Sequence, residues 1–411
     1  MTTFLEEDYA HTSRVAEEAV AGESRVVACA AALRLKLRER TTDTDRLARL
    51  PEATIADLEE SRLFEITTPR RYGGLQLDVH AYMDAMVELG RGDASVSWVA
   101  ALVNINNWFV ATLFPPEVSA EVFSKRGARV AAVLQPRRCK VRKVSGGFHI
   151  EEGLWAFNSG VYHAQWDMLG FPVQDETGAY LAFALLPMTD VQILDDWDTI
   201  GVRGSGSSSV AVRDVFIPDI RIVRADSAQF GKYKSIQLDH EWLYRASFTA
   251  LGQIIIAFPA LGAGLGALDV FTEQLPRRAI AYSPYTKQRE AAVTHLQLGE
   301  ASAKIDAARV IISTAADGIE RYAKAGKQMD QMTQARIRRD TGFASRLIWE
   351  GIDILAGASG GSFASVSHPL NRIWRDARVA GLHATLLPST VYELYGRLLC
   401  GLDRDEARSS L

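Results

Sequence analysis

The hydrophobic pattern of this 411-residue chain changes its period twice, and that change limits the folds that the chain can adopt. From residue 1 to about 130, apolar side chains recur at the spacing of helices. From about 131 to 228, short β-branched and aromatic runs alternate with Gly, Asp and Pro, as strands and turns do. The helical spacing returns from about 229 onward. This order predicts an α+β fold in which a β-domain lies between two helical domains.

Local signals indicate where several helices begin and end. A stretch rich in Ala, Leu, Arg and Glu predicts a helix over residues 15–37. Asp78 is suited to cap the helix that follows it, because a carboxylate accepts hydrogen bonds from unpaired backbone N–H groups, and a second helix is expected to follow from Asp93. Pro115 and Pro116 end the second of these helices. The C-terminal part predicts four long helices joined by short loops, as in an antiparallel bundle: 241–275, 290–324, 329–357 and 384–400.

The composition excludes several kinds of partner and location. The formal charge is −4 and no long basic run occurs, so nucleic acid is not an expected partner. The chain has no uninterrupted run of about 18 apolar residues, so no membrane span is predicted. The N-terminus lacks the apolar core of a signal peptide. The three cysteines lie far apart, which predicts neither a disulfide framework nor a zinc site and agrees with a reducing cytoplasm: Cys29, Cys139 and Cys400.

Motifs of three common enzyme classes are absent or better explained otherwise. The run QIIIAFPALGAGLGALDV holds Gly262, Gly264 and Gly266 in a loose dinucleotide-binding pattern, but no βαβ units surround it. Close helix packing explains these glycines, so the chain has no evident nicotinamide site. The serines in FNSG and RGSGSSS lack the G-x-S-x-G pattern of hydrolases. The histidines show no metal-binding spacing, and no metal site is expected.

Three strings, in order along the chain, resemble segments of the acyl-CoA dehydrogenase superfamily. They are WDTIGVRGSGSSSVAVRDVFIP, ALGAGLGALDVF and RIWRDARVAGLH. The resemblance covers nearly the whole chain. It implies an N-terminal helical domain over 1–130, a central β-barrel or sandwich over 131–228, and a C-terminal antiparallel four-helix bundle over 229–411.

Two departures from that family bear on function. Many dehydrogenases of the family carry a tyrosine shortly after the RDA string, followed by a glutamate that acts as the catalytic base. This chain has His383 and Ala384 at these two positions. Alanine cannot remove a proton from a substrate. VLQPRRCK replaces the family's Gly-rich segment. These departures, with LWAFNSGVYHAQW and AGASGGSF, resemble the two-component flavin monooxygenases, which include phenol hydroxylases, dibenzothiophene oxygenases and amino-sugar nitrososynthases.

The resemblance to that branch implies a cofactor and partners. Such an enzyme binds reduced flavin, FAD or FMN, and reacts it with O2 to give a C4a-hydroperoxyflavin. A separate flavin reductase supplies the reduced flavin. In this family the flavin site is shared between subunits, which implies a homotetramer. The enzyme is expected in the cytoplasm. A flavin-free relative that only binds a ligand is a non-enzymatic alternative.

The same resemblance assigns candidate site residues. Ser159 is expected to hold the flavin edge near N5, through its hydroxyl or its backbone N–H. His383 is expected to act as an acid or base that titrates near neutrality. Together with Ser159, the expected flavin contacts are Trp155, Phe157, Trp197, Arg277, Arg278, His295, Gly360, Gly361 and Ser362.

Three substrate classes are possible. They are the amine of a nucleotide-linked amino sugar, oxidised at nitrogen in antibiotic biosynthesis; a phenol or fused aromatic; and an acyl-CoA thioester. Several aromatic-oxidising relatives carry a histidine on the helix after the DAS string, where this chain has asparagines. Asparagine binds polar groups without titrating, which favours the amino sugar. The expected substrate contacts on this helix are Asn104, Asn107 and Trp108.

Overall fold

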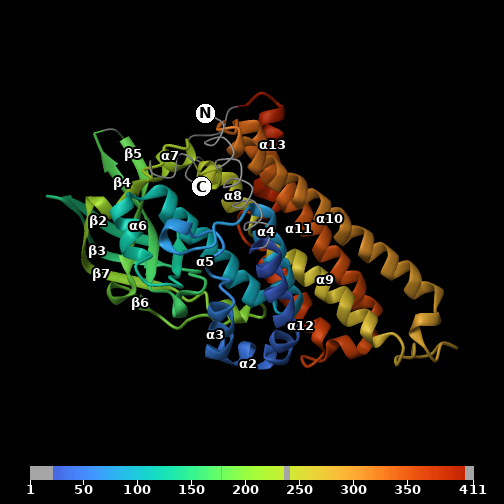
Figure 1. Ribbon diagram of the computed structural model, residues 1–411. Coiled ribbons are helices and arrows are strands. Elements are labelled where there is room, and N and C mark those ends of the chain that lie inside the picture. Colours follow the sequence, from blue (N-terminus) through green and yellow to red (C-terminus); the bar gives the residue numbers. More distant parts are fainter. Residues whose placement is uncertain (1–21, 177, 236–240, 403–411) are drawn as a thin grey trace, which may run out of the picture.

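The computed structural model describes residues 22–176, 178–235 and 241–402 (Figure 1). Figure 1 shows the strands gathered on one side, α4 and α5 in the middle, and the long helices α9, α10 and α11 on the other side. The order of helices, strands and helices agrees with the sequence prediction. Residues 22–39 are helical, and the first part of the helix predicted over 15–37 lies outside the described residues.

Helix α5 is the central element of the N-terminal part. Asp93 caps it by accepting from the backbone N–H of Ser95 at 2.8 Å, and Asp78 caps α4 by accepting from Ala81 at 2.7 Å. The predicted cap at Asp78 and the predicted helix after Asp93 are therefore confirmed. The helices of this part after residue 39 are α2 (Thr41–Leu47), α3 (Glu52–Glu60), α4 (Val79–Gly92), α5 (Ala94–Leu113) and α6 (Pro116–Val122).

The strands form two four-stranded sheets that pack around a shared core. Their orders are β1-β4-β5-β8 and β2-β3-β7-β6. Phe148 of one sheet contacts Phe171 of the other, with ring centroids 5.4 Å apart. The strands are β1 (Val130–Val133), β2 (Arg138–Val144), β3 (Gly147–Trp155), β4 (Trp166–Asp175), β5 (Gly178–Pro187), β6 (Gln192–Ile193), β7 (Val210–Pro218) and β8 (Ile222–Arg224), followed by helix α7 (Ala225–Gln229).

The pairing of β3 with β7 sets up the candidate site. Trp155, the last residue of β3, pairs with Val210, the first residue of β7. The segment that leaves β3 therefore lies beside the segment that enters β7, which includes the short 3-10 turn Arg203–Ser205. Polar side chains from both segments meet at this end of the sheet.

The C-terminal helices differ in two places from the predicted ranges. The range 241–275 holds a 3-10 turn, then α8, then α9, and the chain breaks the helix at residues 255–256. Pro259 lies in the first turn of α9 and has no N–H to continue the hydrogen bonds of α8, which explains the break. Helix α12 lay outside the four predicted ranges. The helices are α8 (Phe248–Ile254), α9 (Ala257–Gln274), α10 (Ala292–Lys324), α11 (Gln331–Ala358), α12 (Pro369–Ala380) and α13 (Pro388–Leu399).

The glycine-rich segment of α9 packs closely against α4, as predicted. A Cβ added at Gly262 would lie 2.4 Å from the carbonyl oxygen of Val87. Two helical segments of the described chain are long and apolar enough to span a membrane: α5, and the stretch Phe248–Gln274 that comprises α8 and α9. However, 94% and 83% of their apolar windows are buried inside the protein, as in core helices.

Candidate active site

The turn that follows β3 is tied to the turn that precedes β7. Ser159 Oγ lies 2.7 Å from Ser207 Oγ. The backbone N–H of Gly160 donates to the carbonyl of Ser205 at 2.7 Å, and that of Asn158 donates to Ser208 at 3.3 Å. These bonds fix the position of Ser159, which is half-buried.

Trp98 connects the two residues that the sequence predicted as catalytic. Its indole N–H donates to Ser159 Oγ at 3.0 Å. Its ring also meets the ring of His383 edge-on, with centroids 5.8 Å apart. The site thus combines a residue of α5, a residue of the β-domain and a residue that follows α12. Trp98 was not among the predicted site residues.

His383 is held as a neutral side chain. Its Nδ1 accepts from the hydroxyl of Thr385 at 2.8 Å and from the Thr385 backbone N–H at 3.4 Å. The neutral ring therefore carries its hydrogen on Nε2. Burial, and to a smaller extent the nearby Arg338 cation, lowers the pKa of His383 to about 4. The expectation that His383 titrates near neutrality is therefore wrong, because burial disfavours the charged imidazolium.

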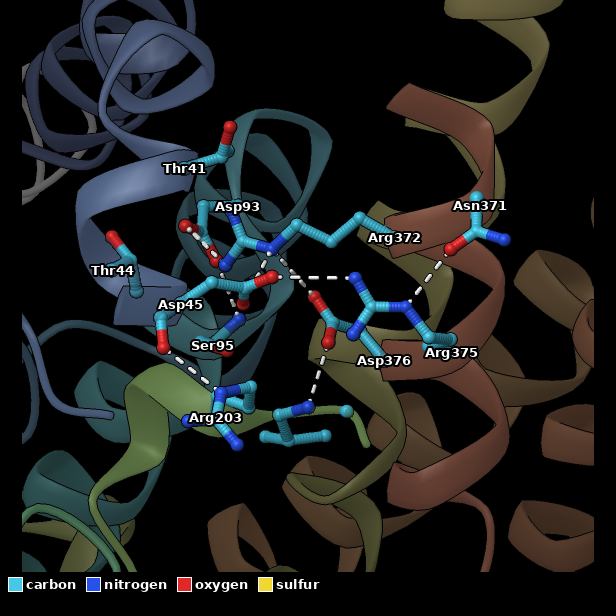
Figure 2. Close-up of polar contacts among 12 residues, drawn as sticks. Thr41, Thr44, Asp45, Asp93, Ser95, Arg203, Asn371, Arg372, Arg375 and Asp376 are labelled. Carbon is cyan, nitrogen blue, oxygen red and sulfur yellow. Dashed lines mark hydrogen bonds and ion pairs between the residues drawn. The ribbon is translucent and has the colours of Figure 1, made fainter. Parts of the chain in front are cut away.

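A buried ionic cluster fixes α12 and the start of α5 relative to each other (Figure 2). Arg372 of α12 contacts Asp93, the cap of α5, at 3.0 Å and Asp45 of α2 at 3.1 Å. Asp376 of α12 accepts from the backbone N–H of Val202 at 2.6 Å. Burial raises the pKa of Asp376 to about 6. Because Trp98 follows Asp93 and His383 follows α12, this cluster sets the frame in which the two rings meet.

A second buried carboxyl group lies directly behind Ser159. Asn158 Nδ2 donates to Asp167 Oδ2 at 2.6 Å, and both side chains are fully buried. The second oxygen of each group, Asp167 Oδ1 and Asn158 Oδ1, has no hydrogen-bond partner among the described residues. Burial raises the pKa of Asp167 to about 7. A protonated Asp167 would carry no buried charge, which is the form that burial favours. This pair was not identified from the sequence. The sequence feature that points to it is an aspartate within the apolar run WDMLGF.

A separate cleft of about 720 Å³ gathers five of the predicted flavin contacts. Arg278 Nη2 donates to Ser362 Oγ at 2.9 Å across this cleft. Burial lowers the pKa of Arg278, and neither it nor Arg277 forms an ion pair with a described residue. Guanidinium groups without an acidic partner suit a phosphate. The predicted residues that line the cleft are Arg277, Arg278, Gly360, Gly361 and Ser362.

The remaining predicted flavin contacts lie apart from this cleft. His295, on the first turn of α10, is exposed and bonds the carbonyl of Arg289 at 2.8 Å. The rings of Phe157 and Trp197 meet edge-on at the β-domain, with centroids 6.1 Å apart, and Phe157 is 66% exposed. Trp155 is fully buried in the β-domain core and donates to the carbonyl of Gly170 at 2.6 Å. The prediction that Trp155 contacts flavin is corrected, because its ring has no exposed surface.

The three predicted substrate residues on α5 are structural. Asn104 donates to the carbonyl of Leu63 at 2.7 Å, and Asn107 donates to that of Ala128 at 2.9 Å. Trp108 donates to the carbonyl of Leu243 at 3.0 Å. All three are buried, at 0%, 1% and 0% exposed. Their polar groups are used by the backbone of neighbouring segments, so the prediction that they bind substrate is corrected.

Comparison with known proteins relates this chain to a protein family. The family model "Acyl-CoA dehydrogenase, N-terminal domain" matches residues 10–114, and "Acyl-CoA dehydrogenase, C-terminal domain" matches residues 254–388. The oxygenase subunit HsaA of a flavin-dependent monooxygenase from Rhodococcus jostii is 30% identical over 365 residues, covering 88% of this chain and 94% of the relative. The oxygenase component of an FADH2-dependent resorcinol hydroxylase from Rhizobium sp. is 27% identical, covering 89% of this chain and 91% of the relative.

A solved structure agrees closely. XiaF from Streptomyces sp., solved in complex with FADH2 and glycerol, superposes with a TM-score of 0.87 at 30% identity, covering 95% of this chain and 98% of XiaF. The fold and the two domain matches show that the chain belongs to the acyl-CoA dehydrogenase superfamily. Within it, the chain is an oxidoreductase of the two-component flavin-dependent monooxygenase branch, whose members use reduced flavin and O2.

The residues present fit a flavin. The cleft of Arg277 and Arg278 suits its phosphate, and the turn at Ser159 offers polar groups to its ring edge. No group of three or more His, Cys, Asp or Glu side chains able to hold a metal ion occurs in the described part of the chain.

Proposed function

We propose that this chain is the oxygenase component of a two-component aromatic hydroxylase that acts on a phenol or a similarly electron-rich ring. The observation that carries the proposal is His383, a neutral imidazole with its hydrogen on Nε2, placed against the ring of Trp98, whose indole N–H donates to Ser159. The relatives named above support it, since one is a resorcinol hydroxylase. Another similar protein is a p-hydroxyphenylacetate 3-hydroxylase oxygenase component from Acinetobacter baumannii.

The amino-sugar alternative has lost its structural support. It was favoured because asparagines on α5 could bind a polar substrate, and those asparagines bond to the protein backbone instead. The acyl-CoA alternative also lacks support, because Ala384 cannot act as a base.

The residues of the site have distinct tasks in this proposal. Bound reduced flavin would activate O2 and supply one oxygen atom to the substrate ring. His383 would donate from Nε2 to the phenol oxygen, which stabilises the electron-rich phenolate form of the ring. Ser159 would hold the flavin edge with its hydroxyl and its backbone N–H. Trp98, which is 6% exposed, would cover this edge and help to exclude water.

The phosphate cleft and the ring site lie at opposite ends of α12. His368, just before α12, lines the cleft, and His383 follows the helix. Twelve helical residues span about 18 Å, and the middle of α12 packs into the ionic cluster of Figure 2. We therefore propose that the cleft serves a flavin whose ring lies in another subunit of a homotetramer. A separate cytoplasmic reductase would supply the reduced FAD or FMN.

The test is isotope incorporation by the purified full-length chain. It is mixed anaerobically with photoreduced FMN or FAD and then with 18O2, in the presence of phenols, indoles, a nucleotide-linked amino sugar or an acyl-CoA. Mass spectrometry should find one 18O atom in a hydroxylated aromatic product. Oxygenated amino sugar, or an enoyl-CoA with no 18O, would overturn the aromatic assignment. Catalase is included in every reaction to remove hydrogen peroxide, so that peroxide does not cause the oxidation that is measured.

A further inference from the structure

A line of hydrogen-bonded side chains runs from the site into the protein. Trp98 Nε1 donates to Ser159 Oγ at 3.0 Å. Ser159 Oγ lies 2.7 Å from Ser207 Oγ, which lies 2.7 Å from Ser205 Oγ. The line ends where Ser205 Oγ donates to the carbonyl of Val202 at 2.7 Å. Ser205 and Ser207 are 1% and 4% exposed, so their hydroxyl groups depend on each other rather than on solvent.

The carbonyl at the inner end sets the direction of each hydroxyl group. A carbonyl oxygen only accepts, so the single hydrogen of Ser205 lies toward Val202. Ser207 must then donate to Ser205, and Ser159 must donate to Ser207. In the opposite direction, the oxygens of Ser205 and Val202 would face each other at 2.7 Å with no hydrogen between them. The hydrogen of Ser159 therefore points away from the site.

Ser159 consequently presents a defined pair of groups to a ligand. Its hydroxyl oxygen has two lone pairs, of which one accepts from Trp98 and the other is left for a ligand donor. Its backbone N–H donates to no other backbone group within the described ranges, so it is available to a ligand acceptor. One acceptor and one donor thus lie side by side on a single residue.

We propose that Ser205 and Ser207 are positioning residues that keep Ser159 an acceptor and thereby make the site prefer reduced over oxidised flavin. The inference rests on the proposed function, in which Ser159 holds the flavin edge. Reduced flavin carries a hydrogen on N5 beside its C4 carbonyl, which matches an acceptor beside a donor. Oxidised flavin has only a lone pair on N5, which would face the lone pair of Ser159.

This preference has a purpose in an enzyme fed by a separate reductase. The chain must take reduced flavin from solution and release the oxidised form after turnover. One neutral hydrogen bond changes an equilibrium by about 2- to 10-fold. The Ser207→Ala variant would free the hydrogen of Ser159 to turn toward N5, so the preference for reduced flavin should fall by about that factor.

The experiment measures both affinities on the full-length protein. Reduced FMN is titrated anaerobically and oxidised FMN is titrated in air, and the ratio of the two Kd values is compared among variants. Ser207→Ala should lower the preference for reduced FMN about 2- to 10-fold, and Ser207→Thr should restore it. Ser209→Ala removes a hydroxyl from the same serine run outside this line and should leave the ratio unchanged.

The midpoint potential of bound flavin gives a second readout. A 2- to 10-fold loss of preference corresponds to a fall of about 10–30 mV for a two-electron couple. If Ser207→Ala does not fold, Ser205→Ala tests the same step, because Ser207 then loses its acceptor.

Two results would overturn the inference. One is a folded Ser207→Ala protein with the wild-type ratio, and the other is an equal change in Ser209→Ala. Failure of the proposed function looks different: the wild-type chain would bind neither form of flavin, or would bind reduced flavin and hydroxylate nothing. If the wild type hydroxylates a phenol and Ser207→Ala keeps the wild-type ratio of Kd values, the proposed function stands and only the role of Ser205 and Ser207 is refuted.

Discussion

The indole of Trp98 contacts both Ser159, to which it donates at 3.0 Å, and His383, whose ring centroid lies 5.8 Å away. One side chain of α5 therefore sets the spacing between the turn after β3 and the loop after α12. Because Trp98 contacts both, its loss should weaken the connection between these two segments.

Replacing Trp98 by Phe tests this role. The variant keeps a ring but loses the N–H donor, so we expect the free energy of unfolding to fall by about 1–2 kcal/mol. The affinity for reduced flavin should change little, since Ser159 keeps its bond to Ser207. Urea denaturation and flavin titration measure the two effects. A variant as stable as the wild type would show that the indole N–H contributes nothing to the site.

The second prediction concerns pH and His383. Burial lowers the pKa of this residue to about 4, so it stays neutral from about pH 5 upward. Product formation at saturating reduced flavin should therefore show no limb near pH 6.5 that belongs to this residue. His383→Ala should lower the rate of product formation about 10- to 100-fold and leave flavin affinity unchanged. A limb near pH 6.5 in the wild type that vanishes in His383→Ala would contradict the assignment.

Much of the fold follows from local sequence signals. The cap at Asp78 and the order of helices and strands depend on neighbouring residues, and the structure agrees with both predictions. The family resemblance also named Arg278 and Ser362 from two distant strings, and the structure brings both into one cleft, while their contact with flavin stays a prediction. The break at residues 255–256 was missed, since the apolar run continues through it and only Pro259 signals it.

The polar residues of the site were harder to predict than the fold. Asn104 and Asn107 looked like ligand contacts because a sequence gives residue type but not the backbone carbonyls that side chains meet. Trp98 and Asp167 were missed for the same reason. Their roles depend on partners 61 and 9 residues away in the chain, and on complete or nearly complete burial.

The third prediction uses Asp167 and the pH dependence of stability. Its pKa is about 7 in the folded chain, above the ordinary value of 3.8. The stability that its neutral form contributes is fully present below pH 3.8 and is lost as pH rises through about 7, because the unfolded chain releases the proton first. Asp167→Asn mimics the neutral acid. Relative to wild type, it should gain a few kcal/mol of stability between pH 4 and 8.

Thermal and urea unfolding at several pH values measure this gain. Asp190→Asn, at an exposed aspartate, is the matched control and should show no such trend. Equal pH dependence in Asp167→Asn and wild type would mean that Asp167 is ionised in the fold.

The fourth prediction concerns the ionic cluster of Figure 2. Arg372→Met would leave Asp93, Asp45 and Asp376 without their shared cation, so we expect a loss of about 3–5 kcal/mol. The exposed pair of Arg46 and Asp43 is the control, and Arg46→Ala should cost less than about 1 kcal/mol. Similar small losses in both variants would show that the cluster does not hold α5 and α12 together.

The last prediction separates the phosphate of the flavin from its ring. Arg278 lies in the cleft with Ser362, has no acidic partner among the described residues, and has a pKa lowered by burial. A phosphate would supply the missing negative charge, and a charge-assisted bond contributes about 1.5–3 kcal/mol. Arg278→Ala should therefore weaken binding of reduced FMN or FAD about 10- to 100-fold. Binding of reduced lumiflavin, which has the ring but no phosphate, should not change.

His295→Ala provides the matched control, because His295 was predicted to reach the flavin but does not line the cleft. It should bind FMN as the wild type does if the contact comes from the cleft alone. Loss of FMN affinity in His295→Ala would instead show that the flavin extends to the start of α10, which an assembled tetramer could bring about. Equal losses for FMN and lumiflavin in Arg278→Ala would mean that this arginine stabilises the fold and does not bind phosphate.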